Sequence, residues 1–435
     1  MHKPLTTRAL IRRWVEGALA EQPVTDVHTH LYPPVFGTPV PNPYTSAAPS
    51  GLMLWGIDQM LTYHYLVAEL FRVVPRGEPT YDQFAAMRTG ERADLVWKKL
   101  FIEHAPVSEA CRGVLTTLQR LGMDTSDRNL DAFRSFYADQ HPDVFVDKVM
   151  QLAGVESVTM TNDVFDDNER QMWLDGKVSG DARFKAVLRL DQLLIDWPAA
   201  AAKLSEWGYP VAAEPDQDTI EQVQRFCRDW LERMKPIYAA VSLPPDFVLP
   251  PESSGAGQRI LAEALLPVLA EHKLPFAMMI GVVRGINPQL GPAGDMGFAS
   301  DVRNLTGLLA AFPDNKFLVT MLSRENQHEL AVAARKFSNL MIFGCWWFLN
   351  NPSLVEEILR MRFELLGTSF IPQHSDARVL DQLVYKWDHS RRLIAQVLTD
   401  KYADLAETGW HISRQEICRD IRLLLRDNFQ QFLDR

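Results

Sequence analysis

Residues 24–30, VTDVHTH, combine the two features that decide the fold and the site. The stretch opens with β-branched and apolar residues, as buried strands do, and closes with two histidines spaced by one residue. Side chains alternate along a strand, so His28 and His30 point to the same face. Two neutral imidazoles on one face can hold a divalent cation. For this motif alone, the alternative is two polar residues at a strand end, each satisfied by hydrogen bonds.

Short apolar runs follow along the rest of the chain, separated mostly by segments with helical spacing. This alternation predicts a parallel α/β sheet, and eight strands with helical crossovers favour a closed (β/α)8 barrel of the TIM type. We expect one barrel over residues 1–435, a helical insertion after the first strand, over residues 55–150, that covers the active-site mouth, and extra C-terminal helices after Asp376. The predicted strands are Val24–His28, Val155–Thr161, Ala186–Leu190, Ile237–Ser242, Pro275–Ile280, Phe317–Leu322, Met341–Cys345 and Gly367–Pro372.

The formal net charge of the 435 residues is −10, which argues against a nucleic-acid or anionic-membrane partner. A few local arginines can still select an anionic substrate. No run approaches the roughly 18 apolar residues of a membrane span, and the first residues form an amphipathic pattern without the apolar core of a signal peptide. We therefore expect a cytoplasmic protein.

A second motif, His374-Ser375-Asp376-Ala377-Arg378, follows the eighth predicted strand. The last strand of a closed barrel lies beside the first, so Asp376 can reach the ion that His28 and His30 would hold. A helix N-cap is the alternative role for this aspartate. Taken with the two histidines, the motif favours a metal site.

This pairing of motifs resembles the amidohydrolase superfamily, and the resemblance narrows to its uronate isomerase family, in a divergent bacterial branch. The segments that carry it run from the first strand to the eighth: VTDVHTHL, LTYHYLVAEL, TNDVFDDNER, LRLD, MLSRENQHEL, FGCWWFLNNP and IPQHSDARVL. The resemblance implies an aldose–ketose isomerase that interconverts D-glucuronate with D-fructuronate, D-galacturonate with D-tagaturonate, or both, by proton transfer between C2 and C1.

The resemblance also implies roles for individual residues. His28, His30 and Asp376 match the ligands of a divalent ion, usually zinc. Arg378 matches an active-site arginine, and Arg189 matches an arginine that clamps the substrate carboxylate, although pairing with an aspartate would be a structural alternative. Tyr65 matches a tyrosine proposed to transfer the proton, with His64 as its partner; an aromatic stripe of the core is the other explanation for this pair.

Other positions complete the expected site. Trp346 and Trp347 match the pair that walls the sugar; in an extended chain they would face opposite sides, so we expect at most one of them to touch substrate. Arg284 aligns with an arginine of the family pattern. Met279 stands where the commoner branch has a histidine, and a thioether is a poor ligand beside nitrogen and oxygen donors. Arg324 and His328 follow the sixth strand and are candidates for substrate contacts.

Two other functions fit the same motifs. A metal-dependent hydrolase of the superfamily would activate water on the ion, although the extra histidines or lysine of such enzymes are not found. A non-catalytic sugar-acid binding protein would explain the histidine that Met279 replaces, but not the retention of the other motifs. The expected partner is a small hexuronate, with no nucleic acid and no membrane, and a homo-oligomer is compatible with the sequence.

Overall fold

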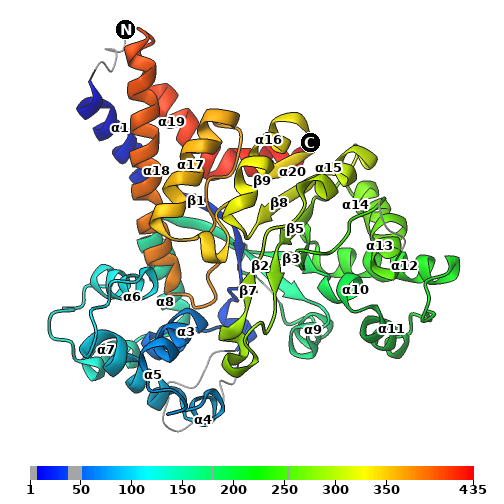
Figure 1. Cartoon of the computed structure of the whole chain (residues 1–435), viewed down its shortest axis with the longest axis horizontal. Coiled ribbons are helices and arrows are strands. Elements are labelled where there is room, and N and C mark those ends of the chain that lie inside the picture. The colour runs from blue at the N-terminus through cyan, green and yellow to red at the C-terminus, as the bar shows by residue number, and fades with distance from the viewer. Residues whose placement is uncertain (1–6, 38–50, 179, 252–254) are drawn as a thin grey trace.

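The structure, a computed structural model, describes residues 7–37, 51–178, 180–251 and 255–435. Seven parallel strands form one curled sheet in the order β1-β2-β3-β4-β5-β8-β9, with helices around it (Figure 1). This confirms the predicted barrel class, and seven of the predicted strands match within three residues at each end. The strands are β1 Val24–Thr29, β2 Val155–Asp163, β3 Phe184–Arg189, β4 Ala239–Leu243, β5 Phe276–Ile280, β8 Phe317–Met321 and β9 Leu340–Ile342.

The eighth predicted strand, Gly367–Pro372, is wrong as a regular strand. Within it, Ile371 forms an isolated parallel bridge with Phe343. The predicted range ends on a proline, which has no N–H to donate to a ladder. The ladder continues through a side chain, since Gln373 Oε1 accepts a hydrogen bond from Cys345 N at 2.6 Å. Extended chain therefore takes the place of a strand here.

The barrel closes between β1 and the segment that follows this bridge. Asp376 N donates to His28 O at 3.1 Å, and His30 N donates to Ala377 O at 2.8 Å. These two backbone hydrogen bonds hold the two metal-site motifs of the sequence against each other. The first and last elements of the barrel are therefore neighbours, as a closed sheet requires.

The interior of the barrel is packed with apolar side chains, which explains why strands such as β5 are buried along their whole length. Six of the seven barrel strands, β1, β3, β4, β5, β8 and β9, contribute to this inner cluster. The C-terminal helix α20, Asn428–Asp434, adds Phe429 and Phe432 to it. The strand residues of the cluster are Val27, Val187, Ala240, Ala277, Met279, Leu318 and Met341.

Helices occupy the chain between β1 and β2, where the sequence predicts the insertion over residues 55–150. In Figure 1, α3 to α7 gather on one side of the barrel. A π-helical turn, Lys98–Ile102, continues α5. The helices are α2 Ile57–Leu61, α3 His64–Val73, α4 Tyr81–Ala86, α5 Thr89–Trp97, α6 Glu109–Arg120, α7 Leu130–Ala138 and α8 Pro142–Ala153.

The other helices alternate with the strands or follow them, and the long α18 runs beside α1 (Figure 1). A small antiparallel hairpin, β6 Val282–Val283 and β7 Met296–Gly297, stands outside the barrel sheet after β5. The remaining helices are α1 Arg8–Glu21, α9 Asp167–Leu174, α10 Asp191–Ile195, α11 Trp197–Glu206, α12 Gln217–Met234, α13 Ala256–Arg259, α14 Leu266–Glu271, α15 Val302–Ala311, α16 Gln327–Lys336, α17 Pro352–Leu366, α18 Gln382–Glu407 and α19 Arg414–Arg422.

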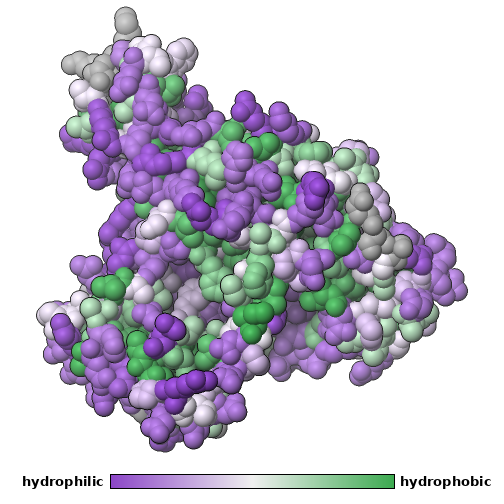
Figure 2. All heavy atoms as spheres, in the orientation of Figure 1, coloured by the Kyte–Doolittle hydropathy of each residue, from purple (hydrophilic) through white to green (hydrophobic). Residues whose placement is uncertain are grey.

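The surface follows the expected polarity. Figure 2 shows a mainly hydrophilic face, with hydrophobic side chains gathered near its centre around the β6–β7 hairpin. Met296 and Phe298 are both exposed there, at 44% and 41%. None of the helices in the described ranges combines the length and apolar composition that a membrane crossing needs.

Candidate metal centre and active site

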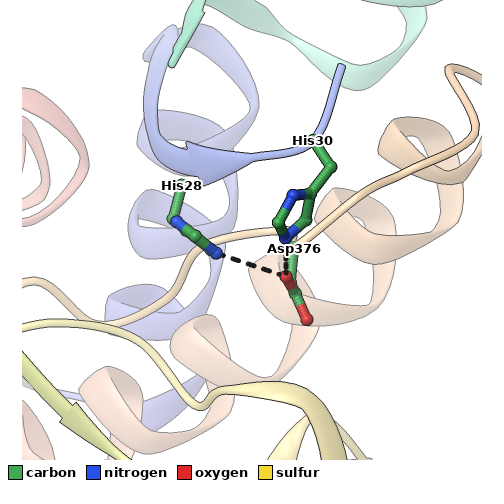
Figure 3. A group of neighbouring side chains, drawn as sticks. All are labelled: His28, His30 and Asp376. Atoms are coloured by element: carbon green, nitrogen blue, oxygen red, sulfur yellow. Dashed lines mark ion pairs between the residues drawn. The ribbon is translucent and has the colours of Figure 1, made fainter. Parts of the chain in front are cut away.

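Three side chains at the C-terminal end of the barrel point toward one another (Figure 3). Asp376 Oδ1 lies 3.4 Å from His28 Nε2 and 3.5 Å from His30 Nε2. One ligand atom from each residue lies within 4.8 Å of the other two. His28 and Asp376 are buried, and His30 is partly exposed. Two nitrogens and one carboxylate oxygen converging at a strand end fit a divalent metal ion.

The surroundings of His30 favour a neutral imidazole. Burial lowers the pKa of His30 to about 4, so its ring is uncharged at neutral pH. Thr161 Oγ1 lies 3.2 Å from His30 Nδ1 and donates its own proton to Thr29 O, so His30 Nδ1 is the donor to it. That tautomer leaves the Nε2 lone pair facing Asp376. His28 Nε2 is buried without a hydrogen-bond partner, which a bound ion would satisfy.

The carboxylates of the motifs have separate tasks. Burial opposes ionisation of Asp376, but the two imidazoles that face it, those of His28 and His30, hold the pKa of its carboxyl well below its usual range. Asp376 also has a positive φ of 52°, a conformation that concentrates at functional sites. Asp26, fully buried, accepts from Ser375 N at 3.1 Å and from Trp387 Nε1 at 2.8 Å. Asp26 therefore ties β1 to the loop that carries Asp376.

A cavity of about 220 Å³ opens over this group. Its residues come from the C-terminal ends of several strands and from the loops that follow, which is where barrel enzymes place their sites. The cavity brings together most of the residues singled out from the sequence. The lining comprises His28, His30, Tyr63, His64, Arg189, Ser242, Met279, Arg284, Trp346, Trp347, Asp376 and Arg378.

The three arginines of the cavity differ in how their charge is matched. Arg189 pairs with Asp191 at 2.6 Å, and although burial opposes this, the aspartate raises the pKa of Arg189. Arg284 forms an ion pair with Asp295, with 2.5 Å between the charged atoms, and Asp295 lies between β6 and β7. Arg378 Nη1 donates to two backbone carbonyls, at 3.1 and 3.0 Å, and forms no ion pair within the described ranges. Arg378 therefore offers the least compensated positive charge.

Both tryptophans line the cavity, whereas in an extended chain they would face opposite sides; that at most one of them touches substrate stays a prediction. The expectation assumed an extended chain. Trp347 instead has a positive φ of 47° and begins a short 3-10 turn, Trp347–Leu349, which turns both rings to the same side. Trp347 also stacks on His64, with ring centroids 5.3 Å apart and planes 20° apart.

The YHY segment is divided between two cavities. Tyr63 and His64 line the cavity over the metal group. Tyr65 lines a neighbouring cavity, and its buried hydroxyl has no hydrogen-bond partner. Tyr63 is the N-cap of α3, and its extended backbone separates its direction from that of the helix.

Arg324 and His328 lie outside both cavities. Arg324 is 56% exposed and pairs with Glu357 at 2.9 Å, and His328 is exposed on α16. By contrast, His374 is fully buried beside the metal group, its ring centroid 5.2 Å from that of His28. No role was predicted for His374, because its place depends on contacts between distant segments.

Comparison with known proteins gives a consistent family. A uronate isomerase of Bacillus halodurans superposes with a TM-score of 0.93 at 52% sequence identity, covering 99% of this chain and 98% of that one. A glucuronate isomerase of Caulobacter crescentus (TM-score 0.76, 14% identity, 100% and 95% covered) and a uronate isomerase of Thermotoga maritima (0.75, 15%, 97% and 97%) share the fold. No protein-family model and no functionally curated sequence matches the chain.

Proposed function

Since the chain belongs to the uronate isomerase family, we propose that it is an aldose–ketose isomerase acting on hexuronates. The substrates would be D-glucuronate, giving D-fructuronate, D-galacturonate, giving D-tagaturonate, or both. The observation that carries the proposal is one cavity lined both by the His28, His30 and Asp376 group and by Arg378. Such a cavity can hold a small molecule at two points, by its hydroxyl oxygens and by its carboxylate.

The metal group suits zinc, which accepts two histidine nitrogens and one carboxylate oxygen and leaves an open position in catalytic sites. When bound, a divalent ion supplies positive charge that polarises sugar oxygens. Asp376 would hold the ion together with His28 and His30. Met279 lines the cavity but adds no suitable donor, so retention of the ion would depend on these three residues.

The carboxylate of the sugar would be bound by arginine. Arg378 has donors left over and no carboxylate partner among the described residues, so an anionic substrate completes its surroundings. The charge of Arg189 is already neutralised by Asp191. Arg189 would therefore orient the substrate carboxylate and add little net positive charge. The rings of Trp346 and Trp347 would exclude water from the other side of the sugar.

His64 and Tyr65 would carry out the proton transfer. Burial lowers the pKa of His64 to about 4, so this imidazole is neutral and can accept a proton. Burial raises the pKa of Tyr65 well above its usual value, so the phenol is protonated and can donate. His64 faces the metal-side cavity while Tyr65 stands behind it, with ring centroids 4.5 Å apart.

A direct test is incubation of the metal-loaded protein with D-glucuronate and with D-galacturonate in deuterated water, followed by NMR. We expect the corresponding ketose, and deuterium at the carbon that receives the proton. Simple amides and lactones serve as hydrolase substrates. Binding without ketose or exchange would indicate a sugar-acid binding protein, and cleavage of an amide or lactone would indicate a hydrolase; either result contradicts the proposal.

A matched pair of variants makes this test specific. Arg378→Met removes the unpaired cation of the cavity, whereas Arg324→Met removes an exposed arginine outside it. Only the first should lose activity. Metal analysis would test zinc, and cell fractionation and light scattering would test the cytoplasmic location and homo-oligomeric assembly that the sequence suggests.

A further inference from the structure

A second cavity, of about 240 Å³, lies beyond the stacked rings of His64 and Trp347. These two residues line both cavities, so their rings form the wall between them. Tyr65 and Lys386 line the far cavity only. Lys386 lies on α18 and is only 4% exposed. A buried ammonium calls for an explanation, because lysine is almost never fully buried unless it is paired.

The acidic residues that act on Lys386 are engaged elsewhere. Asp376 belongs to the metal group, and Asp26 accepts from Ser375 N and Trp387 Nε1. Glu109 pairs with His389 at 2.6 Å and with Arg112 at 2.6 Å.

Their charges act on Lys386 only from a distance. Burial lowers the pKa of Lys386, and the charges of these three carboxylates oppose that shift. Across the described ranges, no side chain forms an ion pair or hydrogen bond with its ammonium.

Lys386 does have one close neighbour, the ring of Tyr65. Its Nζ lies 5.5 Å from the ring centroid, within the range of a cation–π contact. The other groups that act on Tyr65 all oppose its ionisation: burial first, then Tyr63, Asp376 and Tyr385. His64, whose ring centroid is 4.5 Å from that of Tyr65, is neutral, and the carboxylates that line the same cavity, Glu109 and Asp295, would also oppose a phenolate. In the part of the chain that the structure describes, Lys386 is the cation placed over this ring.

We propose that Lys386 is a positioning residue of the isomerisation, whose ammonium stabilises the negative charge that Tyr65 carries after giving up its proton. In the step that forms the enediol, the C2–H bond breaks, its proton goes to the Asp376 carboxylate and its electron pair forms the C1=C2 bond, while the carbonyl oxygen at C1 takes the proton that Tyr65 releases through His64. The electron pair of the Tyr65 O–H bond stays on the phenolic oxygen. In the next step Asp376 gives its proton to C1, and the proton of the C2 hydroxyl returns through His64 to the phenolate. This inference rests on the proposed function.

The first test compares turnover in Lys386→Met, Lys386→Arg and Lys148→Met. Lys148 is the matched control, since its ammonium lies 4.5 Å from the ring of Phe136, away from both cavities. The ammonium of Lys386 lies 5.5 Å from the ring centroid of Tyr65. A unit charge at about that distance from a developing anion changes a rate by about 10- to 100-fold at an effective dielectric constant of about 20.

We therefore expect kcat of Lys386→Met to fall by about 10- to 100-fold, with KM nearly unchanged because Lys386 does not line the metal-side cavity. Lys386→Arg should recover most of the loss, and Lys148→Met should match the unmodified enzyme. An unchanged kcat in Lys386→Met would overturn the inference, and so would an equal loss in both Lys386 variants, which would mean that shape or proton transfer by the amine matters instead of charge.

If Lys386→Met or Lys386→Arg disturbs folding, chemical rescue separates the effect of the lost charge from the effect of altered packing. Lys386→Ala leaves room beside an existing cavity, so ethylammonium should restore part of kcat, whereas propanol, which is similar in size and neutral, should not. Equal rescue by both compounds, or by neither, contradicts an electrostatic role.

A substrate-free measurement distinguishes this inference from the proposed function. Replacing Tyr65 by a difluorinated tyrosine gives a more acidic phenol, which offsets part of the rise in pKa caused by burial and allows the ionisation to be titrated by fluorine NMR. We expect Lys386→Met to raise the ionisation midpoint by about one pH unit or more, and Lys148→Met to leave it in place. The shift without any isomerase activity would refute only the proposed function; activity without the shift would refute only the role of Lys386.

Discussion

Gly344 offers a sharp test of how the metal group is supported. This glycine follows β9 and has a φ of 60°. A Cβ added there would overlap Nδ1 of His374 and stand 2.8 Å from Cγ of the same ring. His374 packs edge-on against His28, with ring centroids 5.2 Å apart. Gly344→Ala should therefore push one imidazole into another and displace a predicted metal ligand.

The magnitude follows from two contributions. An alanine in the left-handed region costs roughly 1–2 kcal/mol, and overpacking of a filled site costs about 1–3 kcal/mol more. Gly176→Ala is the control, because Gly176 also has a positive φ, of 66°, and nothing lies within 4 Å of the added Cβ. Backbone strain destabilises both variants, and overlap with the His374 ring destabilises only Gly344→Ala. For a chain of 435 residues, the extra loss should lower the Tm by a further ~1–3 °C.

The functional effect should be larger than the loss of stability. A displacement of about 1 Å in a reacting group can cost on the order of 100-fold in rate. We expect Gly344→Ala to retain less metal after dialysis and to lose most of its turnover, with Gly176→Ala close to the unmodified enzyme in both. The assays are metal analysis, thermal unfolding and ketose formation. Equal metal content and turnover in the two variants would refute the argument that Gly344 makes room for His374.

Three further changes test other parts of the site. Asp376→Asn keeps the shape but removes the anionic ligand, and should weaken ion retention by more than about tenfold in competition with a chelator. Arg378→Met should lower kcat/KM by about 10- to 100-fold, the value of a charge-assisted hydrogen bond, whereas Arg324→Met should leave it unchanged. Burial raises the pKa of Glu169 from 4.5 to about 7, so the folded state binds this proton more tightly. The free energy of unfolding should then fall by about 3 kcal/mol as pH rises through this interval, and Glu169→Gln should remove the fall in urea unfolding curves.

The parts that the sequence predicts well depend on short-range rules or on the order of elements. Alternation along β1 places His28 and His30 on one face. Closure of a barrel places the segment after the last strand beside the first, which brings Asp376 to them. Neither inference needs knowledge of side-chain packing. The strand-and-helix alternation and the motifs spread along the chain likewise predict the barrel and the family, and the structure and the comparison with known proteins confirm both.

The parts that it predicts poorly depend on local backbone exceptions and on distant contacts. Trp347 leaves the extended path through a positive φ, so a rule based on alternation fails there. The eighth strand is replaced by extended chain in which Gln373 supplies a hydrogen bond from its side chain. Lys386 and His374 gain their surroundings from segments hundreds of residues away. No spacing within the sequence reports such contacts.

The distribution of charge explains how an acidic chain can select an acidic substrate. The net charge of −10 describes the whole chain, whereas selection is decided in the cavity. There, Asp191 matches Arg189 and Asp295 matches Arg284, so those pairs add little net charge. The remaining charges of the cavity are those of Arg378 and Asp376. A bound divalent ion would more than neutralise the single negative charge of Asp376. The loaded cavity would therefore be positive, and its field would act on a bound carboxylate and on the enediolate that develops beside it.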